Sequence, residues 1–127
     1  LVTNQPDVAH GYMEEAVSQK IQKKVEDNLD LDAVKICRHT SLDNCPNRKP
    51  LPGMLFSAAD DLGIDLENSF MVGDTYKDMQ AGKAAGCSTI LIDNFYNQEA
   101  ECDIRVPSLA VAVEVIISRV VMSRKQV

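Results

Sequence analysis

Residues 69–78 read Ser69-Phe70-Met71-Val72-Gly73-Asp74-Thr75-Tyr76-Lys77-Asp78, and this stretch decides the fold class of the chain. Its first five residues form an apolar run that predicts a buried strand, after which Gly73 lets the backbone turn tightly. A helix is predicted from about Tyr76 to Ala85, closed by Gly86. A short buried strand that passes directly into a helix is typical of α/β proteins with a parallel sheet.

Strands and helices also alternate on both sides of this stretch. Apolar residues at helical spacing predict two more amphipathic helices, one closed by Gly63 and a last one capped by Ser108. The first helix has Met13, Ala16, Val17, Ile21 and Val25 on its apolar face, the second has Met54, Leu55, Ala58, Ala59 and Leu62, and the last has Leu109, Ala112, Val113, Ile116, Ile117 and Val120. Strands are predicted over 33–37 and 88–92, and a loop over 40–50.

Strands that alternate with helices indicate parallel strands joined by right-handed crossovers. Their continuous apolar sequence favours a sheet covered by helices on both faces. We therefore expect a single Rossmann-like α/β domain over residues 1–127. Because Leu1 begins within what reads as the end of a buried strand, we also expect a fragment whose first strand lies upstream.

The bulk composition excludes several classes of protein. With 127 residues, 45% of them hydrophobic and 25% charged, the chain has the composition of one globular domain. Its net charge of −6 argues against nucleic acids and membranes as partners, because both require a basic patch. Nothing resembles a signal peptide, so we expect a cytoplasmic protein whose four cysteines do not form a disulfide scaffold. We expect a monomer that acts on a small molecule.

Two carboxylates follow the strand predicted over 69–73. Asp74 lies at the tip of the strand and Asp78 in the first turn of the next helix, at the strand end where such folds form their sites. Two carboxylates in this position suit Mg²⁺, which prefers hard oxygen ligands. For Asp78 the alternative is a capping box with Thr75 as the N-cap, whereas for Asp74 that alternative is weaker.

Polar residues follow two other predicted strands. Lys49 and its neighbour Arg48 are cations able to neutralise phosphate oxygens as charge builds in a transition state. Thr3, Asn4 and Gln5 offer a hydroxyl and two amides that can hydrogen-bond a phosphate. Each group alone also has an ordinary explanation, because single lysines are usually solvated and Asn close before a proline is typical of a turn.

Taken in chain order, Thr3, Lys49 and the pair Asp74 and Asp78 resemble the second, third and fourth motifs of the haloacid dehalogenase (HAD) superfamily of phosphohydrolases. The resemblance covers nearly the whole chain and implies Mg²⁺-dependent transfer through an aspartyl-phosphate, with Thr3 and Lys49 as catalytic residues. The substrate contacts that it implies are Thr3, Asn4, Gln5, Arg48, Lys49 and Thr75. The family's nucleophile belongs to an Asp-x-Asp motif that does not precede Thr3 here, so we expect the chain as printed to be inactive.

Longer matches narrow the resemblance. Residues 3–9 (TNQPDVA), 48–55 (RKPLPGML) and 71–82 (MVGDTYKDMQAG) look like the D-glycero-D-manno-heptose 1,7-bisphosphate phosphatases of the histidinol-phosphatase-like group. The roughly four dozen residues from Thr3 to Lys49 leave room for one βα crossover and no separate cap domain. The implied substrate is a small sugar phosphate used in heptose supply for lipopolysaccharide. Histidinol phosphate, another small phosphomonoester, or a catalytically inactive binding module are the alternatives.

The same group often carries a zinc loop of pattern Cys-x-His followed by Cys-x-Cys. Cys37, His39 and Cys45 match three of these ligand positions, and Asn47 stands at the fourth. Structural zinc uses four nitrogen or sulfur ligands. Either Asp43 or a water completes the coordination sphere, or the loop no longer binds zinc, and the sequence leaves these alternatives open.

Overall fold

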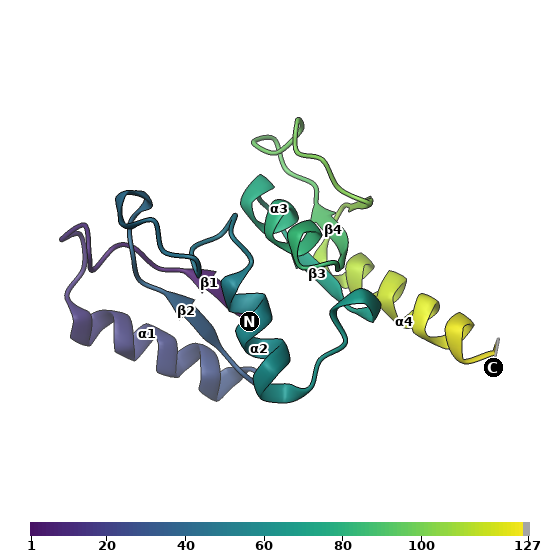
Figure 1. The fold of residues 1–127 in the computed structure, drawn as a ribbon, viewed down its shortest axis with the longest axis horizontal. Helices are drawn as coiled ribbons and strands as arrows, with labels where there is room; N and C mark the ends of the chain where they lie inside the picture. The colour runs from purple at the N-terminus through teal and green to yellow at the C-terminus, as the bar shows by residue number, and fades with distance from the viewer. Residues whose placement is uncertain (126–127) are drawn as a thin grey trace. The chain divides into compact units, whose positions relative to one another are not determined.

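The computed structural model describes residues 1–125, which form two compact units that meet between Ile64 and Asp65 in the sequence (Figure 1). Each unit contains parallel strands and helices. Strands β1 and β2 pair in the first unit, and β3, β4 and β5 form the sheet of the second unit. Parallel pairing with helices between the strands confirms the predicted α/β class.

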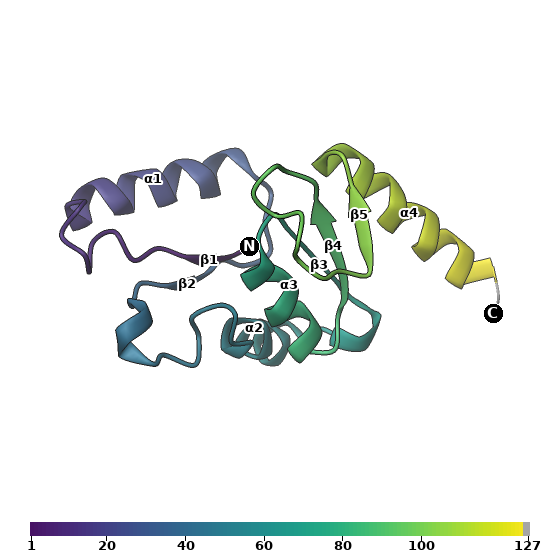
Figure 2. The same cartoon turned by 90° about the horizontal axis from the view of Figure 1, so that it is seen from above.

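The first unit consists of one crossover followed by a loop and a helix. Its elements are β1 (Val2–Asn4), α1 (Glu15–Asn28), β2 (Lys35–Cys37), the 3₁₀ helix η1 (Ser41–Asp43) and α2 (Gly53–Leu62). Figure 2 shows α1 on one side of the two strands and α2 on the other. Asn4 lies opposite Cys37 in the parallel register, so the polar residues that follow both strands start at the same edge. Between Thr3 and Lys49 there is only this one crossover, as predicted.

The predicted apolar face of α1 is largely exposed. Ala16, Val17 and Ile21 are open to solvent, and Ser18 is the residue of this helix that is buried. The hydroxyl of Ser18 accepts a hydrogen bond of 2.8 Å from the guanidinium of Arg38, just after β2. This polar contact lies on the side of α1 that is covered, and the spacing of apolar residues alone did not predict it.

The second unit is a three-stranded parallel sheet with a helix on each face. Its elements are the 3₁₀ helix η2 (Leu66–Asn68), β3 (Phe70–Gly73), α3 (Tyr76–Ala84), β4 (Ser88–Ile92), β5 (Ile104–Val106) and α4 (Leu109–Lys125). Strand β5 was not among the strands predicted from the sequence. Its three residues carry a charged side chain in the middle and become a strand by pairing with β4, where Ile90 lies opposite Ile104.

Alternate residues of this sheet face different helices. On one side Gly82 of α3 packs so closely that a Cβ added to it would lie 2.5 Å from the Cβ of Met71. On the other side Ile90 and Val106 form a core cluster with Ala112 of α4. The helices α3 and α4 therefore cover opposite faces of the sheet (Figure 2). Burial of one such aliphatic side chain contributes about 1.5–3 kcal/mol.

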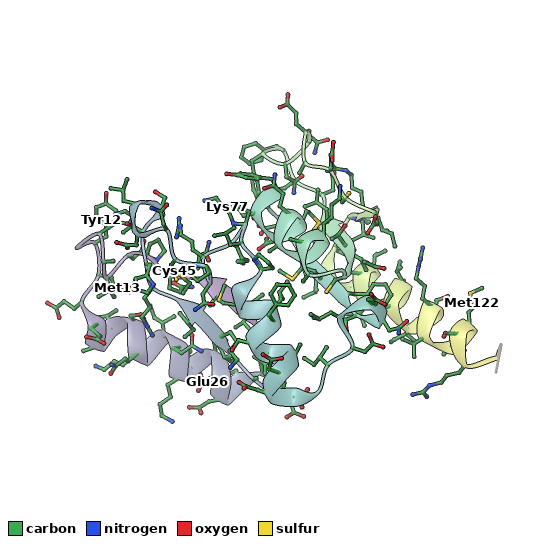
Figure 3. All side chains as sticks on the ribbon, viewed as in Figure 1. Tyr12, Met13, Glu26, Cys45, Lys77 and Met122 are labelled. Atoms are coloured by element: carbon green, nitrogen blue, oxygen red, sulfur yellow. The ribbon has the colours of Figure 1, made fainter. Side chains whose placement is uncertain are left out.

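Only part of the predicted face of α4 packs against the sheet. Ala112 and Ile116 lie in the core as predicted, and Val111 and Val115 accompany them. The other members of the predicted face are exposed, namely Leu109, Val113, Ile117 and Val120. Met122 likewise projects from the far end of α4 (Figure 3). Within residues 1–125 no helix has the length and apolar character needed to cross a membrane.

The helix ends follow the sequence closely. Gly63 closes α2 in the left-handed conformation, with φ of 68°, and its N–H donates to the carbonyl of Ala59. Gly86, with φ of 89°, follows the end of α3. The hydroxyl of Ser108 accepts a hydrogen bond of 3.2 Å from the N–H of Val111 at the start of α4. Local capping signals therefore placed three helix termini correctly.

Candidate functional site

Asp74 and Asp78 lie where β3 passes into α3. Thr75 is the N-cap of α3, and its hydroxyl accepts a hydrogen bond of 3.3 Å from the N–H of Asp78. In return, Oδ2 of Asp78 accepts hydrogen bonds from the N–H groups of Thr75 (3.1 Å) and Asp74 (3.2 Å). The capping box considered from the sequence is therefore present. Asp78 is buried and organises the turn, whereas Asp74 is exposed at the tip of the strand.

Gly73 is required at this turn for space. The turn was expected to use the conformational freedom of glycine, but Gly73 is not among the residues with positive φ. A Cβ at position 73 would instead overlap the carboxylate of Asp78. The absent side chain is what allows Asp78 to fold back over the end of β3 and bind the backbone there.

The loop that follows β4 also contacts Asp74, and the motifs in the sequence did not predict this contact. The hydroxyl of Tyr96 donates a hydrogen bond to Oδ2 of Asp74, and this bond raises the pKa of the Tyr96 phenol. Asn97 is buried, and its Nδ2 donates to the carbonyl oxygens of Asp74 and Ile92, both at 2.8 Å. One signal was available, because this loop leaves the carboxyl end of its strand as the other polar loops do.

Arg105 of β5 holds the same loop in place. Its guanidinium forms an ion pair of 2.9 Å with Asp93 and donates to Oδ1 of Asn97 at 3.2 Å. It also donates to the backbone carbonyls of Asn97, Gln98 and Ala100, at 3.2–3.3 Å. Hydrogen bonds from Gln98 and Arg105 lower the pKa of Asp93, which keeps that carboxylate charged.

In the first unit, Lys49 is held against the end of β1. Its backbone N–H donates to Oδ1 of Asn4, and Nδ2 of Asn4 donates to the Lys49 carbonyl, each at 3.0 Å. The ammonium of Lys49 donates to the carbonyl of Val2 at 3.2 Å. Beside them, Nε2 of Gln5 donates to the hydroxyl of Thr3 at 2.9 Å. The structure thus brings together Thr3, Asn4, Gln5 and Lys49, and it assigns the Asn4 amide to holding the Lys49 backbone.

A cluster of potential metal ligands lies at the end of β2 and in the loop that follows it, where Figure 3 labels Cys45. The ligand atoms of Cys37, His39 and Cys45 all lie within 4.8 Å of one another. Sγ of Cys37 is 3.9 Å from Nδ1 of His39, and burial raises the pKa of the Cys37 thiol. The guanidinium of Arg48 donates to the carbonyl of His39 at 3.0 Å and so links this loop to Lys49.

The candidates for a fourth ligand are engaged elsewhere. Oδ2 of Asp43 accepts hydrogen bonds from the N–H (2.7 Å) and hydroxyl (3.1 Å) of Thr40, and these bonds lower the pKa of Asp43. The side-chain oxygen of Asn47 packs where a Cβ on Gly53 would stand. Within the described residues 1–125, no fourth His, Cys, Asp or Glu joins the three. The cluster is therefore a Cys₂His set.

Parallel strands that carry polar side chains at their carboxyl ends define a Rossmann-like α/β domain, a class that binds small ligands at those ends. A family model described as HAD-hydrolase-like matches residues 46–111, which is more than half of the chain. The chain belongs to this family of HAD-like hydrolases.

Individual relatives agree with the family assignment. The chain is 33% identical over 106 residues to the D-glycero-alpha-D-manno-heptose-1,7-bisphosphate 7-phosphatase of Campylobacter jejuni, covering 80% of this chain and 60% of that protein. It is 39% identical over 104 residues to the D-glycero-beta-D-manno-heptose-1,7-bisphosphate 7-phosphatase of Pasteurella multocida, covering 72% and 56%. The chain therefore spans less than two thirds of the length of these relatives.

A solved structure shows the same fold. The D,D-heptose 1,7-bisphosphate phosphatase from B. bronchiseptica, complexed with magnesium and phosphate, superposes with a TM-score of 0.83 at 30% sequence identity. The match covers 92% of this chain and 72% of that one. This similarity confirms the predicted HAD fold and the predicted resemblance to heptose bisphosphate phosphatases.

Proposed function

We propose that the complete protein is a Mg²⁺-dependent phosphatase of a small sugar phosphate, D-glycero-D-manno-heptose 1,7-bisphosphate. One observation carries the proposal. Thr3 lies within β1 near its carboxyl end, Lys49 in the loop that follows β2, and Asp74 directly after β3, in a chain whose relatives are named for this reaction. By resemblance, the pathway is the heptose supply for lipopolysaccharide or a related glycan.

The side chains of the first unit would bind the phosphate. Lys49 carries the positive charge that offsets phosphoryl oxygens, and its ammonium is already oriented by the carbonyl of Val2. Thr3 offers a hydroxyl for the same group, while Gln5 orients that hydroxyl. Arg48, tethered to the carbonyl of His39, is the candidate for the sugar or its second phosphate.

The carboxylates of the second unit fit Mg²⁺. Asp74 is exposed and Asp78 lies one helical turn away, so hard oxygen donors meet at a strand end. Bound there, Mg²⁺ would supply charge neutralisation for the phosphoryl oxygens. We assign Asp74 as the principal ligand, because Oδ2 of Asp78 already holds the turn through three donors.

We also propose that Cys37, His39 and Cys45 hold a structural Zn²⁺. Two thiols and one imidazole are the ligands that zinc prefers, and their ligand atoms are already close together. Metal analysis of the purified protein gives a direct test, with one zinc expected per chain and its loss in Cys45→Ala. A wild-type protein purified with added zinc that retains none would contradict the proposal.

We further propose a monomeric, cytoplasmic enzyme whose partner is a small phosphorylated sugar. Binding to nucleic acid or anionic lipid is disfavoured by the net charge of −6. Sedimentation of the purified protein should give the mass of one chain, and cell fractionation should place it with the soluble proteins. A dimer or a membrane-bound fraction would contradict this part of the proposal.

The decisive assay measures phosphate release by the complete gene product. Heptose 1,7-bisphosphate, as separate α and β anomers, and histidinol phosphate are compared at equal concentrations with and without Mg²⁺. Faster release from a heptose anomer, abolished by removal of Mg²⁺, supports the proposal and identifies the anomer. Faster release from histidinol phosphate, or no release from any of the three, would overturn it in favour of another phosphatase or of a binding module.

A further inference from the structure

The loop of residues 93–100 contacts Asp74 through Tyr96 and Asn97, and no motif accounts for these contacts. We propose that Tyr96 and Asn97 are positioning residues that orient Asp74 for its metal ion. This inference rests on the proposed function, because it takes Asp74 as the ligand of Mg²⁺. It extends the set of residues on which metal binding depends from β3 and α3 to the loop after β4.

Asn97 fixes the main chain of Asp74. Asn97 is 4% exposed, and its side-chain amide takes part in four hydrogen bonds. Nδ2 donates to the carbonyls of Asp74 and Ile92, and Oδ1 accepts from the N–H of Asn94 (2.9 Å) and from Arg105 (3.2 Å). Because Nδ2 faces two carbonyl oxygens and Oδ1 faces two N–H donors, only one orientation of the Asn97 amide satisfies all four hydrogen bonds. The backbone of Asp74 cannot move without breaking a buried hydrogen bond, which costs about 1–3 kcal/mol.

Tyr96 fixes the carboxylate itself. Tyr96 is 51% exposed, its ring packs edge-to-face against Phe95, and its hydroxyl donates to Oδ2 of Asp74. A hydrogen bond to one carboxylate oxygen restricts rotation about the side chain and presents the other oxygen, Oδ1, to a cation. Ligating carboxylates are commonly held by such a second hydrogen bond, and its loss lowers metal affinity about 10–100-fold.

A merely structural role for the loop makes a different prediction. If Tyr96 only tethered the loop, its hydroxyl would affect stability and leave the metal affinity unchanged. Tyr76 provides the matched control, because it is also a half-exposed tyrosine, 52% exposed, and lies close to Asp74 in the sequence at the start of α3. Its ring contacts the ammonium of Lys77, at 6.0 Å from the ring centroid.

The test uses the complete gene product with Tyr96→Phe, Asn97→Ala, Tyr76→Phe and Asp74→Asn. Free Mn²⁺ is followed by electron paramagnetic resonance as a probe of metal binding, and the Mg²⁺ concentration for half-maximal phosphate release is measured alongside. The Mn²⁺ binding that disappears in Asp74→Asn is assigned to the Asp74 site and is thereby distinguished from binding at any other metal site. We expect Tyr96→Phe to weaken Mn²⁺ binding about 10-fold with an unchanged melting temperature. We expect Tyr76→Phe to match wild type.

The outcomes separate this inference from the proposed function. If Asp74→Asn binds Mn²⁺ as well as wild type, the metal assignment of the proposed function fails. If Asp74→Asn loses the metal but Tyr96→Phe binds it with unchanged or higher affinity, the positioning role fails and the proposed function stands. Asn97→Ala should weaken binding further and lower the melting temperature. Tyr96→Phe alone decides the positioning role, whether or not Asn97→Ala folds.

Discussion

The two units hold their functional side chains in different ways. In the second unit they stand on a packed sheet, whose buried apolar residues are Met71, Met79, Ala81, Ala85, Cys87, Ile90, Leu91, Val106 and Ala112. In the first unit the buried apolar residues are Cys37, Met54 and Leu55. Lys49 is therefore held by hydrogen bonds with the Asn4 amide and with the Val2 carbonyl, whereas Asp74 belongs to a frame fixed by apolar packing. The second unit should tolerate the loss of a functional side chain better.

The largest effect is expected for Asp74→Asn. Asparagine has the same shape but lacks the negative charge that a cation requires, so Mg²⁺-dependent phosphate release should fall by about 10²–10³-fold or more. The packed sheet beneath it should leave the melting temperature within a few degrees of wild type. Phosphate release by the complete gene product measures the loss of activity, and its thermal unfolding measures the melting temperature. Full activity in this variant would contradict the assignment of Asp74 as a metal ligand.

A second substitution pair compares the two cores directly. Ile90 is completely buried between β3, β5 and α4. Ile90→Ala should therefore lower the free energy of unfolding by about 4 kcal/mol, toward the upper end of the range for replacing a buried isoleucine by alanine. Leu55 of α2 is 9% exposed and lies in the thinner core, so Leu55→Ala should cost about 2 kcal/mol. Urea unfolding of both variants measures the difference. Equal losses would mean that the first unit is packed as tightly as the second.

The features that could be predicted from the sequence are those that depend on neighbours along the chain. The run at 69–73, the capping box of Thr75 with Asp78 and the closing glycines all act within a few residues, and the structure has each of them. The motif order that indicated the HAD superfamily also depends on short segments. These signals sufficed for the fold class and for the residues at the strand ends.

What could not be predicted depends on residues far apart in the sequence. The contacts of Tyr96 and Asn97 with Asp74 span 22 and 23 residues. The strand β5 exists because β4 offers it a parallel edge, and its own three residues carry little signal. On α4, Val115 packs in place of the predicted Val113, because the position of the sheet decides which side of a mostly apolar helix is covered.

Asn4→Ala tests how far Lys49 depends on polar contacts alone. The substitution removes both hydrogen bonds between the Asn4 amide and the Lys49 backbone, so phosphate release should fall about 10-fold and stability by about 1–2 kcal/mol. Asn28→Ala is the matched control, because the Asn28 side chain makes one hydrogen bond, to the carbonyl of Lys24 on the exposed surface of α1. An activity loss no larger than in this control would show that Lys49 is held by other contacts.

The two capping boxes allow a finer comparison of the units. Thr75 caps the nine-residue helix α3, and Thr40 makes the same reciprocal bonds at the three-residue η1. Thr75→Ala should lower the free energy of unfolding by about 1 kcal/mol, as usual for an N-cap. Thr40→Ala should lower it by about half of that or less, because it caps one turn on the surface. Denaturant unfolding of both variants measures the two changes in the free energy of unfolding. A larger decrease for Thr40→Ala than for Thr75→Ala would contradict this prediction.

The smallest expected effects are on how stability depends on pH and salt, and they involve Asp93 and Asp43. Both carboxylates are exposed, and both have a lowered pKa. A carboxyl whose folded pKa lies below its unfolded value of about 3.9 stabilises the fold above that pH and loses this contribution as the pH falls through the folded pKa. Asp93→Asn and Asp43→Asn should therefore each flatten the loss of stability below about pH 4.

Salt should affect the contributions of these two carboxylates to stability differently. Asp93 has the charged partner Arg105, whereas the main partners of Asp43 are the N–H and hydroxyl of Thr40. At about 1 M salt the charge interaction is screened within roughly 3 Å. The difference between Asp93→Asn and wild type should shrink, while that of Asp43→Asn should persist. Thermal unfolding between about pH 2.5 and 6 at low and high salt measures both. Equal salt sensitivity would mean that long-range charge, and not the local hydrogen bonds, sets the pKa at both sites.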